Sequence, residues 1–144
     1  MSIKIFYDDT SFRIRGWRKV VKIIENIIER EKKFTGTLHF IITKDESLRK
    51  INVQFLEHDY NTDVISFDYC NCEIINGEIY ISIETVKKNA INYKVSFKKE
   101  LLRVMIHGVL HLLGYDDKTK NQISEIRKME DMWLNIFEEK INEF

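Results

Sequence analysis

Residues 101–113, LLRVMIHGVLHLL, form an almost unbroken apolar segment in this 144-residue chain. They belong to a helix predicted over residues 97–113, with apolar side chains on nearly every side. A helix that is apolar all round is buried, so this segment predicts the central helix of the core. His107 and His111 interrupt it, and residues four apart share one face of a helix with Cβ atoms about 5–6 Å apart.

The remaining chain alternates between segments with strand-like and helix-like patterns. Strands are predicted at residues 3–7, 37–43, 64–69 and 78–83, and further helices at 17–33, 46–56, 85–93 and 123–141. The pair Asn76-Gly77 is typical of a tight turn, so the last two strands are expected to form a hairpin around it. The predicted fold class is α/β, of the α+β-like kind. It has a small mixed sheet of about four strands packed with about five helices in one domain over residues 1–144.

Composition limits the classes of function that need consideration. No apolar run approaches 18 residues and the first 15 residues lack the apolar region of a signal peptide, so we expect a cytoplasmic protein without a membrane partner. The formal net charge is zero, but residues 84–104 carry six Lys or Arg against two Asp or Glu. Such a segment can form a basic face for a polyanion or plain helix surface. Its members are Lys87, Lys88, Lys94, Lys98, Lys99 and Arg103.

The two histidines can bind one metal ion, because imidazoles on one helix face reach it at about 2.0–2.1 Å each. Each buried ring nitrogen needs a partner, and a metal supplies one to both rings, although backbone carbonyls are the alternative. Gly114 favours a helix end, and the acidic pair Asp116-Asp117 that follows can supply a third ligand. In zinc peptidases of the H-E-x-x-H type a glutamate follows the first histidine, whereas Gly108 stands here, which disfavours that class.

Three segments resemble the YbeY family of bacterial endoribonucleases and ribosomal-RNA maturation factors. Residues 107–117, HGVLHLLGYDD, are similar to the family pattern H-G-x-L-H-L-x-G-Y-D-H. Residues 52–67 resemble N-x-x-Y-R-x-x-D-x-P-T-D-V-L-S-F, and residues 77–82 resemble G-D-I-x-I-S. The similarity extends from about residue 45 to 118. It implies a single α/β domain, a zinc-type ion held by three side chains, and action on RNA in ribosome maturation.

The resemblance assigns the metal ligands to His107, His111 and Asp117, with aspartate in the place of the family's third histidine. Aspartate can ligate zinc, but it makes the site less positive by one unit. We expect weaker Lewis acidity, a higher pKa of a bound water and a shift of preference toward harder metals. Asp116 is the nearest candidate for a general base, although a loop carboxylate more often terminates a turn.

A second departure concerns the family's arginine, whose place is taken by Leu56. A leucine cannot clamp a phosphate as a guanidinium can. His58, two residues later, is a candidate donor in its place, or else a surface histidine of the loop. Asn61 replaces the family proline. Thr62, Asp63 and Ser66 match the family, so we expect them either to line a cleft beside the metal or to terminate local structure.

The leading interpretation is a metal-dependent endoribonuclease, specific for single-stranded RNA, that acts in ribosomal RNA maturation and ribosome quality control. Its cofactor would be one divalent ion, zinc in the first place, and its partners ribosomal RNA precursors and components of the ribosome or its small subunit. The alternative is a ribosome-associated assembly factor with a mainly structural metal site, which Leu56 favours. A metallohydrolase of small molecules or peptides is a third, weaker interpretation because of Gly108.

Overall fold

The computed structural model of the protein describes residues 2–58 and 60–141. Within these ranges four strands and five helices follow one another. They are β1 (Ser2–Tyr7), α1 (Trp17–Arg30), β2 (Phe34–Thr43), α2 (Asp45–Leu56), β3 (Val64–Asp68), β4 (Ile74–Ser82), α3 (Ile83–Tyr93), α4 (Phe97–Leu112) and α5 (Lys120–Ile141). The predicted fold class is confirmed: helices pack on a small mixed sheet.

The described strands form one sheet with the order β1-β2-β4-β3. β1 pairs in parallel with β2, β2 pairs in parallel with β4, and β3 joins the edge antiparallel to β4. Parallel neighbours need a crossover connection, which α1 supplies between β1 and β2. The two central strands turn fully buried side chains toward the core, among them Leu38, Phe40, Ile42, Ile79 and Ile81.

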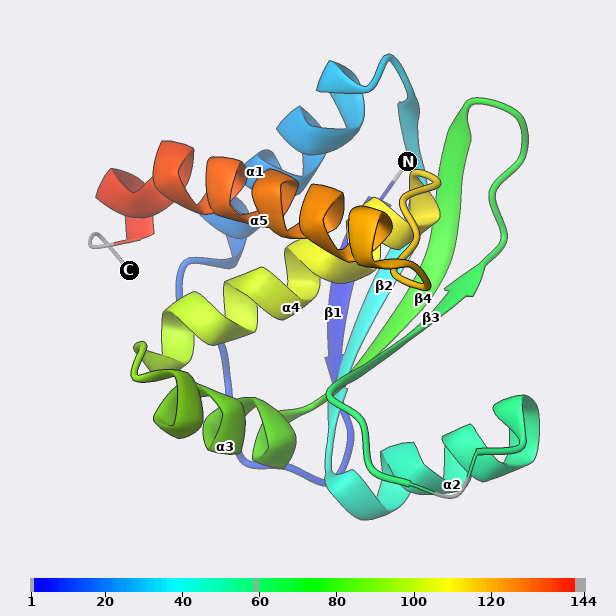
Figure 1. The fold of residues 1–144 in the computed structure, drawn as a ribbon, viewed down its shortest axis with the longest axis vertical. Helices are drawn as coiled ribbons and strands as arrows, with labels where there is room; N and C mark the ends of the chain where they lie inside the picture. The colour runs from blue at the N-terminus through cyan, green and yellow to red at the C-terminus, as the bar shows by residue number, and fades with distance from the viewer. Residues whose placement is uncertain (1, 59, 142–144) are drawn as a thin grey trace.

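The helices are distributed unevenly around the sheet. In Figure 1, α1, α3, α4 and α5 lie together on one side, whereas α2 lies apart from them near one end of the strands. α4 packs against both β3 and β4 on one side and against α5 on the other. No helix among residues 2–58 and 60–141 is both long enough and apolar enough to span a membrane.

α4 is the central core helix that its sequence predicts. It begins at the Ser96 cap, whose Oγ accepts a hydrogen bond from the Lys99 N–H at 3.1 Å. Gly108 allows the helix to approach the sheet closely. A Cβ at that position would lie 2.8 Å from Ile79 Cγ2 and 3.3 Å from Ser66 Oγ. The histidine-bearing helix is therefore held against β3 and β4 by direct packing.

The hairpin of β3 and β4 is confirmed, but the prediction that Asn76-Gly77 forms its turn is wrong. Both residues lie inside β4, and the connection occupies residues 69–73. The Asn76 side chain instead serves the other neighbour of β4. Its Oδ1 accepts the Thr37 N–H at 2.8 Å, where the pairing of β2 with β4 shifts register. An Asn-Gly pair can thus support an irregular strand pairing as well as a turn.

Candidate metal centre

His107 and His111 meet on one half-buried face of α4. Their Nε2 atoms are 2.9 Å apart and their ring planes cross at 77°. The two side chains retain 22 and 27 % of their accessible surface, so each is half-buried with one edge open. The expectation that the two imidazoles share one helix face is therefore confirmed.

Asp117 reaches the histidines because the chain reverses after α4. Gly114 has a φ of 103°, in the left-handed region that glycine adopts without a steric penalty. The hydroxyl of Tyr115 donates a hydrogen bond of 2.6 Å to Glu31, which fixes the start of the loop. Asp117 Oδ2 then lies 3.5 Å from His107 Nε2 and 3.4 Å from His111 Nε2.

The three side chains fit a single metal ion. Among the described residues, they form the one cluster of histidine, cysteine or carboxylate groups close enough to hold one. Ligand atoms about 2.0–2.1 Å from a tetrahedral zinc lie about 3.3–3.4 Å from one another. The two distances from Asp117 match this spacing, and the shorter contact between the histidines is that of a direct hydrogen bond. Two imidazoles and one carboxylate also leave one tetrahedral position open, as catalytic zinc sites do.

A buried carboxylate behind the site orients His107. Glu130 is only 3 % exposed, and its Oε2 lies 2.6 Å from His107 Nδ1. Because a carboxylate accepts the hydrogen bond, Nδ1 carries the proton, and in the neutral ring Nε2 keeps its lone pair for a metal. Arg103 donates to Glu130 at 3.1 Å and to Asp131 at 2.9 Å.

These neighbours also set the proton affinity of His107. Burial lowers its pKa, but the hydrogen bond that His107 donates to Glu130 and the charges of Glu130, Asp117 and Asp63 raise it, and the net pKa lies above its ordinary value. Sequence reasoning missed Glu130. Its signal was an acidic residue within the apolar stripe of α5, four positions after Ile126 and three before Trp133.

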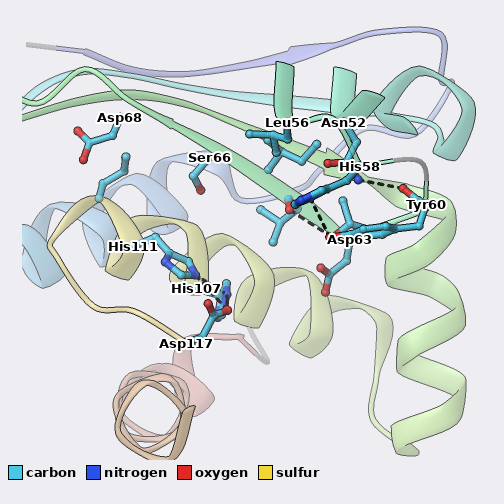
Figure 2. Close-up of a pocket in the computed structure, with 14 residues that line it drawn as sticks. Asn52, Leu56, His58, Tyr60, Asp63, Ser66, Asp68, His107, His111 and Asp117 are labelled. Atoms are coloured by element: carbon cyan, nitrogen blue, oxygen red, sulfur yellow. Dashed lines mark hydrogen bonds and ion pairs between the residues drawn. The ribbon is translucent and has the colours of Figure 1, made fainter. Parts of the chain in front are cut away.

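A cavity of about 330 Å³ opens beside this group and gathers most of the predicted site residues. His58, Thr62, Asp63 and Ser66 all line it together with the three potential ligands (Figure 2). Asp116 is not brought to this cavity. It lines a different one, and its Oδ1 accepts the backbone N–H of Asp117 at 2.8 Å.

Comparison with known proteins gives the family. The family described as Endoribonuclease YbeY matches residues 5–138. This chain belongs to the YbeY family. It is 44 % identical over 137 residues to the Endoribonuclease YbeY of Flavobacterium psychrophilum, and the alignment covers 95 % of this chain and 98 % of that protein. It is 43 % identical to that of Amoebophilus asiaticus, over 92 % of this chain and 91 % of that protein.

A solved structure supports the architecture. The solution structure of TM1509 from Thermotoga maritima aligns with a TM-score of 0.62 and 27 % identity. The alignment covers 99 % of this chain and 96 % of that one. The resemblance inferred from three short segments is thus confirmed over nearly the whole length.

The wall of the cavity that lies away from the metal group carries one of the departures from the YbeY pattern. Leu56, where the pattern has arginine, lines this wall together with His58 and Tyr60 (Figure 2). The rings of His58 and Tyr60 stack with centroids 5.2 Å apart, and Tyr60 Oη is 3.0 Å from His58 Nδ1. Asn52 Nδ2 donates to the Tyr60 carbonyl at 2.9 Å and ties this pair to α2.

Asp63 lies between the metal group and the wall formed by Leu56, His58 and Tyr60, and its environment is partly apolar. Burial raises the pKa of its carboxyl, although His107 and backbone N–H groups oppose that shift. The Asn89 side chain donates to Asp63 Oδ2 at 3.3 Å. Asp63 is therefore held at the cavity by Asn89 on α3 and by its own carbonyl, which accepts the Ser82 N–H at 3.0 Å just before β3 begins.

The basic residues predicted from residues 84–104 do not line this cavity. Among its described lining residues there is no lysine or arginine. Arg103 lies nearby, but it pairs with Glu100, Glu130 and Asp131. Lys87 lies over the ring of Phe97 at 5.9 Å instead. If RNA enters the cavity, its charge must be met there by groups other than these cations.

Proposed function

We propose that this protein is a metal-dependent endoribonuclease that cleaves single-stranded RNA in the cytoplasm during ribosomal RNA maturation and ribosome quality control. The observation that carries the proposal is the group of His107, His111 and Asp117, whose side chains line one cavity. Membership of the YbeY family supports the same activity. The proposed partners are ribosomal RNA precursors and components of the ribosome or its small subunit.

In this proposal the cofactor is one divalent ion, zinc in the first place, bound by His107 Nε2, His111 Nε2 and an oxygen of Asp117. The bound ion would supply Lewis acidity toward a phosphoryl oxygen and a lower pKa of a bound water. Glu130 holds the Nδ1 proton of His107 and so keeps Nε2 available as a ligand. Thr62, Asp63 and Ser66 would face the substrate from the other side of the cavity.

His58 is the residue of the far wall best suited to contact phosphate. When the Tyr60 hydroxyl donates to His58 Nδ1, the neutral ring carries its proton on Nε2 and becomes a hydrogen-bond donor. A donor is valuable there because Asp63, Asp68 and Asp117 line the same cavity without a lysine or arginine among its described walls. His58 would thus replace part of the anion binding that Leu56 cannot provide.

The test compares wild type with His111→Ala on a labelled single-stranded RNA. His39→Ala is the matched control, because His39 packs against Phe6 at 5.0 Å on another part of the sheet. We expect metal content and cleavage to fall together in His111→Ala and to stay unchanged in His39→Ala. Circular dichroism would check folding of both variants. Unaltered cleavage by folded, metal-free His111→Ala would contradict the proposal.

The metal ligand from the loop is tested separately with Asp117→Ala. Elemental analysis should show reduced metal occupancy in this variant, because one of three ligands is removed. Asp9→Ala is its matched control, since this exposed carboxylate pairs with Lys44 and lines neither cavity at the ligand group. Equal metal occupancy in Asp117→Ala and wild type would remove Asp117 from the ligand set.

A second candidate function is a ribosome assembly factor whose metal is structural. The position of Leu56 in the cavity wall favours it, because the wall then lacks a guanidinium. The two functions are separated in cells that lack the protein. If His111→Ala restores normal ribosomal RNA precursors as wild type does, the assembly factor is supported. If it restores none while folding normally, the nuclease is supported.

A further inference from the structure

A second and larger cavity, of about 600 Å³, adjoins the candidate metal centre. It lies between the turn that joins α3 to α4, the polar side of α4 and the first half of α5. Asp63, His107 and Asp117 line both cavities, so the two spaces meet at the metal-binding group. Glu130 orients His107 and Arg103 donates to Glu130, but the proposed catalysis and the ligand set use no other part of its lining.

The floor of this second cavity contains a carboxylate that lacks a hydrogen-bond donor. Glu100 is only 2 % exposed, and its Oε1 accepts no hydrogen bond from the described residues. Arg103 Nε lies 3.8 Å from Oε1, which is an ion pair without a hydrogen bond. Burial raises the pKa of this carboxyl in spite of Arg103. A buried acceptor left without a donor is costly, so a ligand that brings an N–H is favoured here.

The Glu100 carboxylate can present either oxygen to the cavity. The terminal torsion of a glutamate is broad, and turning it costs little compared with a staggered side-chain torsion. Glu100 lines the cavity in its present orientation. A donor that enters the cavity can therefore reach the unsatisfied oxygen without a change in the backbone of α4.

The charge of the second cavity selects the kind of ligand. Four carboxylates line it, from Asp63, Glu100, Asp117 and Glu130, against the guanidinium groups of Arg103 and Arg127. This excess of negative charge disfavours a phosphate. It does not form a second metal site either, because the described residues contain one cluster of potential ligands, and Glu100 is not in it. An uncharged group that donates hydrogen bonds fits best.

The entrance of the second cavity offers apolar surface to a flat ring. Tyr93 is 57 % exposed and Ile123 is 41 % exposed, and both line the cavity. Exposed aromatic side chains stack with nucleobases in single-stranded RNA recognition. The cavity thus combines a stacking surface at its rim with an unsatisfied acceptor at its floor, beside the place where a phosphate would be cleaved.

We propose that the second cavity binds the base of the nucleotide next to the cleaved phosphate, and that Glu100 selects a base with an exocyclic amino group, cytosine above uracil. Acidic side chains accept hydrogen bonds from the N4 amino group of cytosine. Uracil presents a carbonyl oxygen at the same position, which a carboxylate repels. This inference rests on the proposed function, because it names the substrate preference of the same site.

The test measures binding of CMP and UMP, each as the 3′ and the 5′ phosphate, to the zinc-loaded protein by NMR titration. The phosphate and ribose are identical in the two nucleotides, so the ratio of their Kd values isolates the base. We expect wild type to bind CMP about tenfold more tightly than UMP. In Glu100→Gln the ratio should fall to about one, because an amide can donate to uracil O4 as readily as it accepts from cytosine N4.

Two further variants distinguish the effect of the Glu100 acceptor from a general change in charge or in nucleotide affinity. Asp131→Asn removes a charge beside Arg103 from a residue that does not line the cavity, and it should keep the wild-type ratio. Tyr93→Ala removes an exposed ring, so it should weaken both nucleotides about equally without changing the ratio. Thermal unfolding of each variant would show that it is folded. If Glu100→Gln fails to fold, Tyr93→Ala and the wild-type ratio still test the cavity.

Equal Kd values of CMP and UMP for wild type would overturn the base assignment. A wild-type ratio that persists in folded Glu100→Gln would also overturn it. Two equivalents of bound zinc in wild type and one in Glu100→Gln would show that the second cavity binds a second cation and not a base, which would also overturn the proposal. RNA cleavage without any preference between cytosine and uracil would contradict this inference but not the proposed nuclease activity. A clear preference for binding CMP over UMP, without RNA cleavage, would contradict the proposed nuclease activity but not the base-binding site.

Discussion

Glu130→Gln tests how the carboxylate behind His107 supports metal binding. The glutamine keeps the shape of the side chain and an oxygen that can accept from Nδ1, but it removes the buried charge 2.6 Å from that atom. Loss of such a partner behind a metal-bound histidine typically lowers metal affinity by about 10- to 100-fold, or about 1.4–2.7 kcal/mol. We expect a loss of this size for zinc at pH 8, where protons compete less with the metal for His107 than at lower pH.

The same substitution should change the pH dependence of zinc binding. In wild type the carboxylates raise the pKa of His107 in spite of its burial, so zinc must displace a proton increasingly as the pH falls. In Glu130→Gln one of the charges that raise the pKa of His107 is gone, so burial lowers that pKa further. Protons then compete less with zinc for His107. The ratio of wild-type to variant affinity should therefore be largest at pH 8 and should narrow toward pH 6.

The assay is a competition titration against a colorimetric zinc chelator at both pH values. Asp131→Asn is the matched control, because Asp131 contacts Arg103 but not the histidine. Its affinity should stay within about twofold of wild type. Equal affinities of wild type and Glu130→Gln at pH 8, or a ratio that widens toward pH 6, would refute this account of Glu130.

Three further substitutions test the surroundings of the site. Gly108→Ala would place a Cβ 2.8 Å from Ile79 Cγ2, so we expect the free energy of unfolding to fall by about 1–3 kcal/mol in urea; an unchanged value would contradict the close packing of α4 on β4. Tyr115→Phe removes the hydrogen bond to Glu31 and should cost about 1 kcal/mol by the same method. It should also remove a phenol whose pKa is raised to about 12 by burial and by Glu31, which ultraviolet titration can detect. Asp117→His makes the site more positive by one unit, so a pH–rate profile of RNA cleavage should shift its acidic limb to lower pH; no shift would count against Asp117 as a ligand.

The part of the site that the sequence predicts best is the part that is local in the chain. The spacing of His107 and His111 places them on one helix face, and Gly114 predicts the reversal that brings Asp117 back. Glu130 was missed because its contact with His107 joins residues 23 positions apart, on two helices whose crossing the sequence does not specify. Arg103 was considered for a basic face or for plain helix surface, and its ion pairs were missed for a similar reason, since its carboxylate partners Glu130 and Asp131 on α5 are also distant in the chain.

The fold shows the same division between local and distant information. Periodicity predicts the helices and strands because each pattern repeats within a few residues. The order β1-β2-β4-β3 depends on which strands meet across the sheet, and no single segment encodes it. The error at Asn76-Gly77 has a similar origin. The asparagine satisfies a backbone N–H of Thr37, 39 residues earlier, and that partner outweighs the local preference for a turn.

The three potential ligands differ in how firmly the protein holds them. His107 and His111 lie on α4, whose backbone hydrogen bonds break only when the core packed around Met105 and Val109 comes apart. Asp117 lies on a loop with a half-exposed side chain, and that loop can open while the core stays intact. Amide hydrogens of α4 should therefore exchange at the rate of global unfolding, and those of residues 114–119 much faster. An ion bound here would enter and leave when the loop that carries Asp117 opens. The two imidazoles would keep their positions on α4 throughout.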